Sequence, residues 1–221
     1  MYYAIIGDLV ASRHYENRYE LQEKLKNILN DINREYSDEI GANFLITLGD
    51  EFQGLLIQPL HLLPIVDKIR FSMYPVKIRM GIGIGDINTQ IDRTQAIGAD
   101  GPAYHHARKM IEEIRKNEIS QQSRLQDIKI ASTQQEVYLD LINCNLDLCS
   151  CLENSWTEKQ FDTISLILYK QISQKEASKM IGISASSIQR RLTSAHYYDY
   201  KFARELIGKT LIEGWKDIDG K

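Results

Sequence analysis

The chain has 221 residues, of which 43% are hydrophobic and 26% are charged, and its formal net charge is -3. This composition is ordinary for a globular protein of one or two domains, and no apolar run is long enough to span a bilayer. The charge is uneven. Residues 155–221 hold 11 Lys and Arg against 8 acids, a net charge of +3, while the first 154 residues hold 16 and 22, a net charge of -6. The asymmetry fits a basic C-terminal part that meets a polyanion.

Three cysteines lie close together in one apolar stretch, at Cys144, Cys149 and Cys151. No histidine lies near them, which argues against a zinc site. An odd number of cysteines and the lack of a signal peptide favour reduced thiols and a cytoplasmic location, without a membrane partner.

The hydrophobic pattern predicts elements in the order β-α-β-β-α-β-α-β. The strands are expected at 2–7, 43–48, 52–57, 76–84 and 128–131, and the helices at 19–36, 60–73, 102–116 and 134–152. This order predicts an α+β sandwich with a mostly antiparallel sheet and helices on one face. The glycines of 76–84 indicate that something approaches the backbone of that strand closely. A capping box from Thr157 to Gln160 marks the boundary between a domain at 1–153 and a small all-helical domain at 154–221.

Two aspartates, Asp8 and Asp50, each follow a glycine at the end of an apolar strand. A buried carboxylate is costly unless it is compensated, and Mg²⁺ typically takes one or two carboxylates together with substrate phosphates. If the two strands are neighbours, the acids can share a cation. The main-chain N–H groups of Leu9, Val10, Ala11 and Ser12 can then hold phosphate oxygens. The plainer alternatives are that Asp8 caps the next segment and that Asp50 belongs to a hairpin turn.

Several segments resemble known families. Residues 6–10 and 47–52 resemble the metal-binding strand and hairpin of class III nucleotidyl cyclases, and the hairpin also resembles that of GGDEF diguanylate cyclases. Residues 79–85 are similar to the following cyclase strand, and residues 107–110 fall where cyclases place a transition-state arginine. Together with residues 98–104, these segments resemble the SatD family of bacterial proteins.

The resemblance implies a ferredoxin-like, cyclase-like sandwich that binds a nucleoside triphosphate or a related nucleotide. Asp8 and Asp50 would bind Mg²⁺ or Mn²⁺, Gly49 and Glu51 would lie against the nucleotide, and Arg108 would be the catalytic arginine. Arg108 as an ordinary surface residue of a helix is the alternative.

Two positions depart from the cyclase pattern. Purine-reading cyclases carry a lysine shortly before the hairpin and an asparagine one turn before the arginine, and this chain has Ile46 and Tyr104 there. The departures count against cyclisation and against adenine or guanine specificity.

Residues 174–192 resemble the helix-turn-helix of bacterial regulators. The small Ser178 lets two helices cross, Gly182 permits a left-handed turn, and Ser184 caps the second helix. The expected contacts with double-stranded DNA come from Ser184, Ser186, Ser187, Gln189, Arg190 and Arg191. A homodimer is expected if a defined operator is read, and the apolar residues of 197–215 are expected in a core or a dimer surface. A helical docking module is the alternative.

Three hypotheses follow. The first is a transcriptional regulator whose nucleotide- and metal-binding domain controls a DNA-binding helix-turn-helix. The second is an active, metal-dependent nucleotidyl cyclase or related phosphoryl transferase that makes a signalling nucleotide. The third is a metal-free protein-interaction module. The missing lysine and asparagine favour the first over the second.

Overall fold

The structure, a computed structural model, describes residues 1–10, 17–119 and 126–214 and contains one five-stranded sheet. The strands are β1 (Tyr2–Leu9), β2 (Ile40–Leu48), β3 (Glu51–Leu56), β4 (Ile78–Gly85) and β5 (Ile128–Ala131). Their order across the sheet is β2-β3-β1-β4-β5, and only the β4–β5 pair is parallel. The first four strands have the order and directions of a ferredoxin-like βαββαβ unit, which confirms the predicted fold class.

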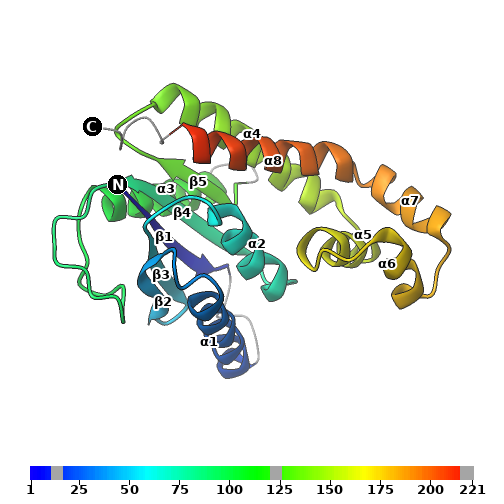
Figure 1. The fold of residues 1–221 in the computed structure, drawn as a ribbon, viewed down its shortest axis with the longest axis horizontal. Coiled ribbons are helices and arrows are strands. Elements are labelled where there is room, and N and C mark those ends of the chain that lie inside the picture. The colour runs from blue at the N-terminus through cyan, green and yellow to red at the C-terminus, as the bar shows by residue number, and fades with distance from the viewer. Residues whose placement is uncertain (11–16, 120–125, 215–221) are drawn as a thin grey trace.

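Helices surround this sheet and extend beyond it (Figure 1). They are α1 (Arg18–Glu35), α2 (Leu62–Met73), α3 (Pro102–Ile119), α4 (Glu136–Ser155), α5 (Glu158–Ile164), the π-helical η2 (Ser165–Tyr169), α6 (Gln174–Ile181), α7 (Ala185–Ser194) and α8 (Tyr197–Glu213). No helix in the described parts of the chain has the length and apolar character that crossing a bilayer requires.

Both faces of the sheet are covered, so the prediction of helices on one face is wrong. One face packs in a single core with α1, α2, α4 and α8, whereas α3 packs on the opposite face against β4 and β1. The glycines of β4 explain the close approach of α3, as the sequence predicted. A Cβ atom on Gly81 would lie 2.1 Å from the carbonyl oxygen of Ala107, and one on Gly83 would lie 1.9 Å from that of Ala103.

The C-terminal helices form a second core and also rejoin the first. Trp156 and Ile164 pack with residues of α6, α7 and α8, and the predicted capping box between Thr157 and Gln160 is present. However, Ile207 and Leu211 of α8 belong to the core of the sheet, and Figure 1 shows α8 alongside α4. The division of the chain at residue 153 therefore stays a prediction, since the last helix packs in both cores.

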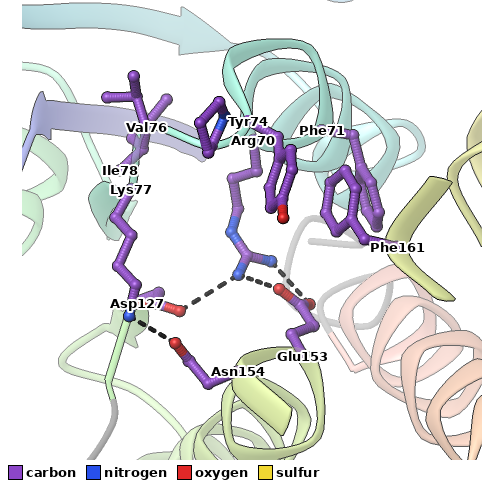
Figure 2. A pocket seen from close by; sticks show the side chains of 11 residues that line it. Arg70, Phe71, Tyr74, Val76, Lys77, Ile78, Asp127, Glu153, Asn154 and Phe161 are labelled. Carbon is purple, nitrogen blue, oxygen red and sulfur yellow. Dashed lines mark hydrogen bonds and ion pairs between the residues drawn. The ribbon is translucent and has the colours of Figure 1, made fainter. Parts of the chain in front are cut away.

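A buried ionic network connects α8 to α2 and the end of α4, and Figure 2 shows its centre, where Arg70 lies against Asp127 and Glu153. Arg70 of α2 donates to the Glu153 carboxylate at 3.0 Å and to Asp127 at 3.3 Å. The Tyr200 hydroxyl of α8 donates to the same Glu153 carboxylate at 2.5 Å, and Arg204 of α8 is ion-paired with Asp67. These contacts fix the C-terminal helices against α2 and the end of α4.

Candidate ligand site at the end of the central strands

A row of charged side chains crosses three neighbouring strands. Asp8 on β1 lies directly opposite Glu51 on β3 and Arg79 on β4. Side chains alternate between the faces of a strand, and Asp8 shares the α3 face with Ile6, which belongs to the core beneath α3. The row therefore lies between the end of the sheet and the last turns of α3.

Asp8 is the most deeply buried acid of this row, and two arginines neutralise it. Its side chain is 6% exposed. Arg79 makes a two-pronged contact, from Nε to Oδ1 and from Nη2 to Oδ2, each at 2.9 Å. Arg115 of α3 donates from Nη2 to Oδ2 at 2.6 Å. Paired hydrogen bonds of this kind compensate the burial of a carboxylate.

Arg115 is the centre on which the acids converge. Its Nη2 lies 3.7 Å from Glu51 Oε2 as well as against Asp8. Burial lowers the Arg115 pKa, but the hydrogen bond and charge of Asp8, with the charges of Glu51 and Asp50, raise it above its usual value. The two predicted aspartates, Asp8 at the end of β1 and Asp50 in the turn before the adjacent β3, thus act on one positively charged group.

Asp50 reaches this position through the β2–β3 hairpin. Leu48 pairs with Glu51, so Gly49 and Asp50 form a two-residue turn, and Gly49 has the positive φ of +65° that favours glycine at such a turn. The amide of Leu9 donates to the Asp50 carbonyl at 3.3 Å, which brings the turn beside the end of β1.

The fit of a divalent cation can be judged from these donors. Carboxylate oxygens are the ligands that Mg²⁺ and Mn²⁺ prefer, and Asp8, Asp50 and Glu51 supply them at one end of the sheet. Within the described residues, no three acid, histidine or cysteine side chains form a ready metal site. The donor chemistry fits, but Arg115 lies among the acids and must move away before a cation can share Asp8 and Asp50.

The predicted free amides after β1 need a correction. The Leu9 amide bonds to Asp50 and the Val10 amide donates to the Lys77 carbonyl at 2.9 Å, because the β ladder continues past the end of β1. Neither donor is open to a phosphate. Ala11 and Ser12 lie outside the described residues.

Exposed cationic groups are present instead at α3. Arg108 is 44% exposed and donates to Glu51 at 2.7 Å, and Arg115 is 39% exposed.

The two positions that depart from the cyclase pattern present no polar group to a nucleotide base. Tyr104 of α3 is buried in the core between this helix and the sheet, its hydroxyl has no hydrogen-bond partner among the described residues, and burial raises its pKa above the usual range. Ile46 packs against the core on the other face of the sheet.

The predicted DNA-contacting residues lie at the start and along the outer part of α7: Ser184, Ser186, Ser187, Gln189, Arg190 and Arg191. Gly182 has a positive φ of +73° and Ser184 accepts from the Ser187 amide, so the predicted turn and cap are present. Arg191 is partly engaged, because it donates to the Thr163 hydroxyl at 3.2 Å. The small residue that lets α6 cross α7 is Ala177, which is fully buried, and not Ser178.

Arg79 and Arg115 were missed by sequence reasoning. Arg79 meets Asp8 only through the pairing of strands that lie about 70 residues apart, and no local pattern carries that register. A signal did exist for Arg115, because it follows Arg108 by two helical turns and so shares its face.

Fold and site together define an α+β protein, with an acid and arginine cluster at the end of its central strands and a run of helices from α4 to α8 after them. The chain belongs to the SatD family, whose pattern it matches over residues 2–210. A comparison with curated proteins gave no match.

Two solved structures are similar. One is a bacterial light-regulated adenylyl cyclase, with 12% identity and a TM-score of 0.40, over 58% of this chain and 74% of that one. The other is the catalytic core of a rhodopsin-guanylyl cyclase with converted specificity, in complex with ATPαS. It has 16% identity and a TM-score of 0.36, over 50% of this chain and 71% of that one.

Proposed function

We propose that the chain is a nucleotide-responsive DNA-binding regulator. In this proposal a nucleoside triphosphate or related nucleotide binds at the end of β1 and β3 with Mg²⁺ or Mn²⁺, and α7 binds duplex DNA. The observation that carries the proposal is the convergence of Asp8, Asp50 and Glu51 with two partly exposed arginines of α3.

Asp8 and Asp50 are the residues that would hold the cation, and a bound cation would neutralise phosphate charge there. Arg108 and Arg115 would bind phosphate oxygens. Guanidinium groups suit this task because they hold planar pairs of donors, and both side chains have room to turn toward solvent. Arg79 is only 14% exposed and would stay with Asp8, so that the buried carboxylate keeps one partner.

DNA binding by α7 is the second part of the proposal. The exposed side chains of Ser186, Gln189 and Arg190 are donors of the kind that contact base edges and phosphates in a major groove. The net charge of +3 from residue 155 onward favours a polyanion as the partner. The buried network of Arg70, Glu153 and Tyr200 would couple the two parts, since it holds α8 against α2.

A nucleotidyl cyclase or related transferase is the second candidate. Two observations favour a regulator over this candidate: Tyr104 is buried and Ile46 is packed against the core, so neither presents a polar group that reads a base. A metal-free interaction module is the third candidate, and the converging acids count against it.

Calorimetry tests the ligand site. ATP and GTP are titrated with Mn²⁺ into the wild-type chain, Asp50→Ala and the control Asp31→Ala, whose acid lies exposed on α1. We expect the wild type and the control to bind and Asp50→Ala to bind at least tenfold more weakly. Equal binding in all three would remove the metal role of Asp50.

Two further assays separate the candidates. Pyrophosphate release during prolonged incubation with Mn²⁺ would establish an enzyme, whereas binding without release supports a regulator. A gel shift with random duplex DNA should show affinity that falls as salt rises, because phosphate contacts release counterions. The double variant Arg190→Ala/Arg191→Ala should lose that affinity.

A further inference from the structure

Helix α4 carries an outward apolar seam with heptad spacing. Its members are Val137, Leu141, Cys144, Leu148 and Cys151, which follow one another at intervals of four, three, four and three residues. All five are exposed, and the three aliphatic side chains are 74%, 61% and 59% exposed. The core of the sheet is contacted by other residues of α4, such as Leu139, Ile142 and Leu146. A strict alternation of three and four is the pattern of a helix that packs against another helix.

Further exposed apolar side chains lie on α8, the helix beside α4. Of the fourteen large hydrophobic side chains that are exposed among the described residues, seven lie on α4 and its neighbour α8. On α8, Tyr198, Phe202 and Leu206 lie at intervals of four residues, on the side opposite its buried face. Figure 1 shows the two helices side by side along one edge of the molecule.

The size of this surface suits a stable protein partner. From the exposed fractions, the seven side chains present roughly 700 Å² of mostly apolar area, close to the ~800 Å² per partner of a standard interface. Monomers rarely leave contiguous apolar patches of this size uncovered.

The charges beside the seam permit a second copy of the same helix as the occupant, and the matching heptad spacing favours one. α4 contains no Lys or Arg, and the exposed charges near its seam are Glu136 and Asp140. If two copies cross antiparallel at Cys144, the middle of the seam, the two Asp140 residues lie about 12 Å apart along the helix axis. That distance exceeds the Debye length of ~8–10 Å, so salt screens their repulsion. In a pair of identical helices, the seam side chains of each copy can pack into the gaps between the seam side chains of the other, because both seams have the same spacing.

We propose that two copies of the chain pair through α4 in an antiparallel arrangement, with the two-fold axis at Cys144. Phe202 and Leu206 of α8 flank the paired helices. The contact is isologous, so it closes as a dimer and leaves no open end for further growth.

The pairing has a consequence that rests on the proposed DNA binding. The C-terminal module leaves α4 at Ser155, eleven residues from Cys144. In the antiparallel pair the two Ser155 residues are therefore about 33 Å apart along the axis. Two recognition helices that read successive major grooves need ~34–36 Å between half-sites. The 33 Å separates the two ends of α4, and the helices α5, η2 and α6 then lie between each end and its α7, so these helices add to the spacing that the seam sets between the two copies of α7.

Light scattering of the full chain measures the mass without nucleotide or DNA, so its result is independent of the proposed function. We expect a dimer of the wild type, and a dimer of Ile97→Glu, a control that places the same charge on an exposed apolar residue elsewhere. Leu141→Glu/Leu148→Glu should be monomeric with an unchanged helical circular dichroism spectrum. A monomeric wild type at tens of micromolar, or a double variant that stays dimeric, overturns the proposal.

Disulfide cross-linking provides a second measurement, which does not introduce a charged side chain into the seam as the glutamate variants do. We expect mild oxidation to cross-link Cys151→Ser through Cys144, and to leave Cys144→Ser uncross-linked, because the two Cys151 residues would be about 21 Å apart. A cross-link in Cys144→Ser indicates a parallel pair and overturns the antiparallel arrangement. The absence of a cross-link in Cys151→Ser overturns the position of the axis.

Discussion

Replacing Arg115 with glutamine should increase the affinity of the chain for Mn²⁺. Arg115 donates to Asp8 at 2.6 Å and lies beside Glu51, so a cation that uses these acids competes with it. Glutamine keeps a polar side chain of moderate length but removes the positive charge. Asp8 remains buried and paired with Arg79, so the strand end should stay folded.

The size of the effect follows from the contact that the cation must break. A hydrogen bond between charged groups contributes about 1.5–3 kcal/mol. Arg115 is 39% exposed, which places its contact near the lower end of that range because solvent screens it. A loss of about 1.5–2 kcal/mol corresponds to a roughly 10- to 30-fold higher affinity for Mn²⁺ in Arg115→Gln.

Electron paramagnetic resonance of free Mn²⁺ during a titration measures this affinity directly. Arg34→Gln is the matched control, since it removes the same charge from an exposed position on α1. If Arg115→Gln binds Mn²⁺ no better than the wild type and this control, Arg115 does not compete with a cation. If Arg115→Gln/Asp8→Asn binds as well as Arg115→Gln, the metal is held elsewhere.

Three substitutions test the packing that positions the site. Tyr104→Phe removes a buried hydroxyl that has no partner among the described residues, and should stabilise the fold by about 1 kcal/mol, a rise in Tm of about 3 °C in thermal unfolding. Gly83→Ala forces a methyl group into the backbone of α3 and should cost about 3 kcal/mol or more in urea unfolding, whereas Gly208→Ala, with its nearest neighbour at 3.6 Å, should cost nothing. Arg70→Met leaves buried carboxylates without their cation and should cost about 3–5 kcal/mol in the same assay. A stable Gly83→Ala would contradict the close approach of α3, and a neutral Arg70→Met would contradict the burial of its ion pairs.

The sequence predicts local structure well because local structure depends on neighbours along the chain. The alternation of β4, the helical spacing of α1 and the capping box at Thr157 depend on residues within a turn or two, and all three are present. The adjacency of β1, which carries Asp8, and β3, which follows Asp50, also follows from the ferredoxin-like order of elements.

The parts that escaped prediction depend on long-range geometry. The glycines of β4 indicated a close neighbour, but not that α3 would cover the second face of the sheet. The position of Arg79 opposite Asp8 depends on strand register, and the amides of Leu9 and Val10 are used because the ladder continues past residue 7, where the strand was predicted to end. On α8, apolar residues occur on more than one side of the helix, and the contacts with the core decide which of them are buried.

The decisive measurement is a calorimetric titration of ATP and GTP into the wild type and Asp50→Ala, each with Mn²⁺ and with EDTA. If Asp50 acts through a bound cation, the nucleotide should bind the wild type with Mn²⁺, and removing either the metal or the carboxylate should weaken binding to a similar extent. Removing both should add little more, because the two changes abolish the same interaction. Nucleotide binding of equal strength under all four conditions, or no binding in any, would contradict a cation shared by Asp8 and Asp50.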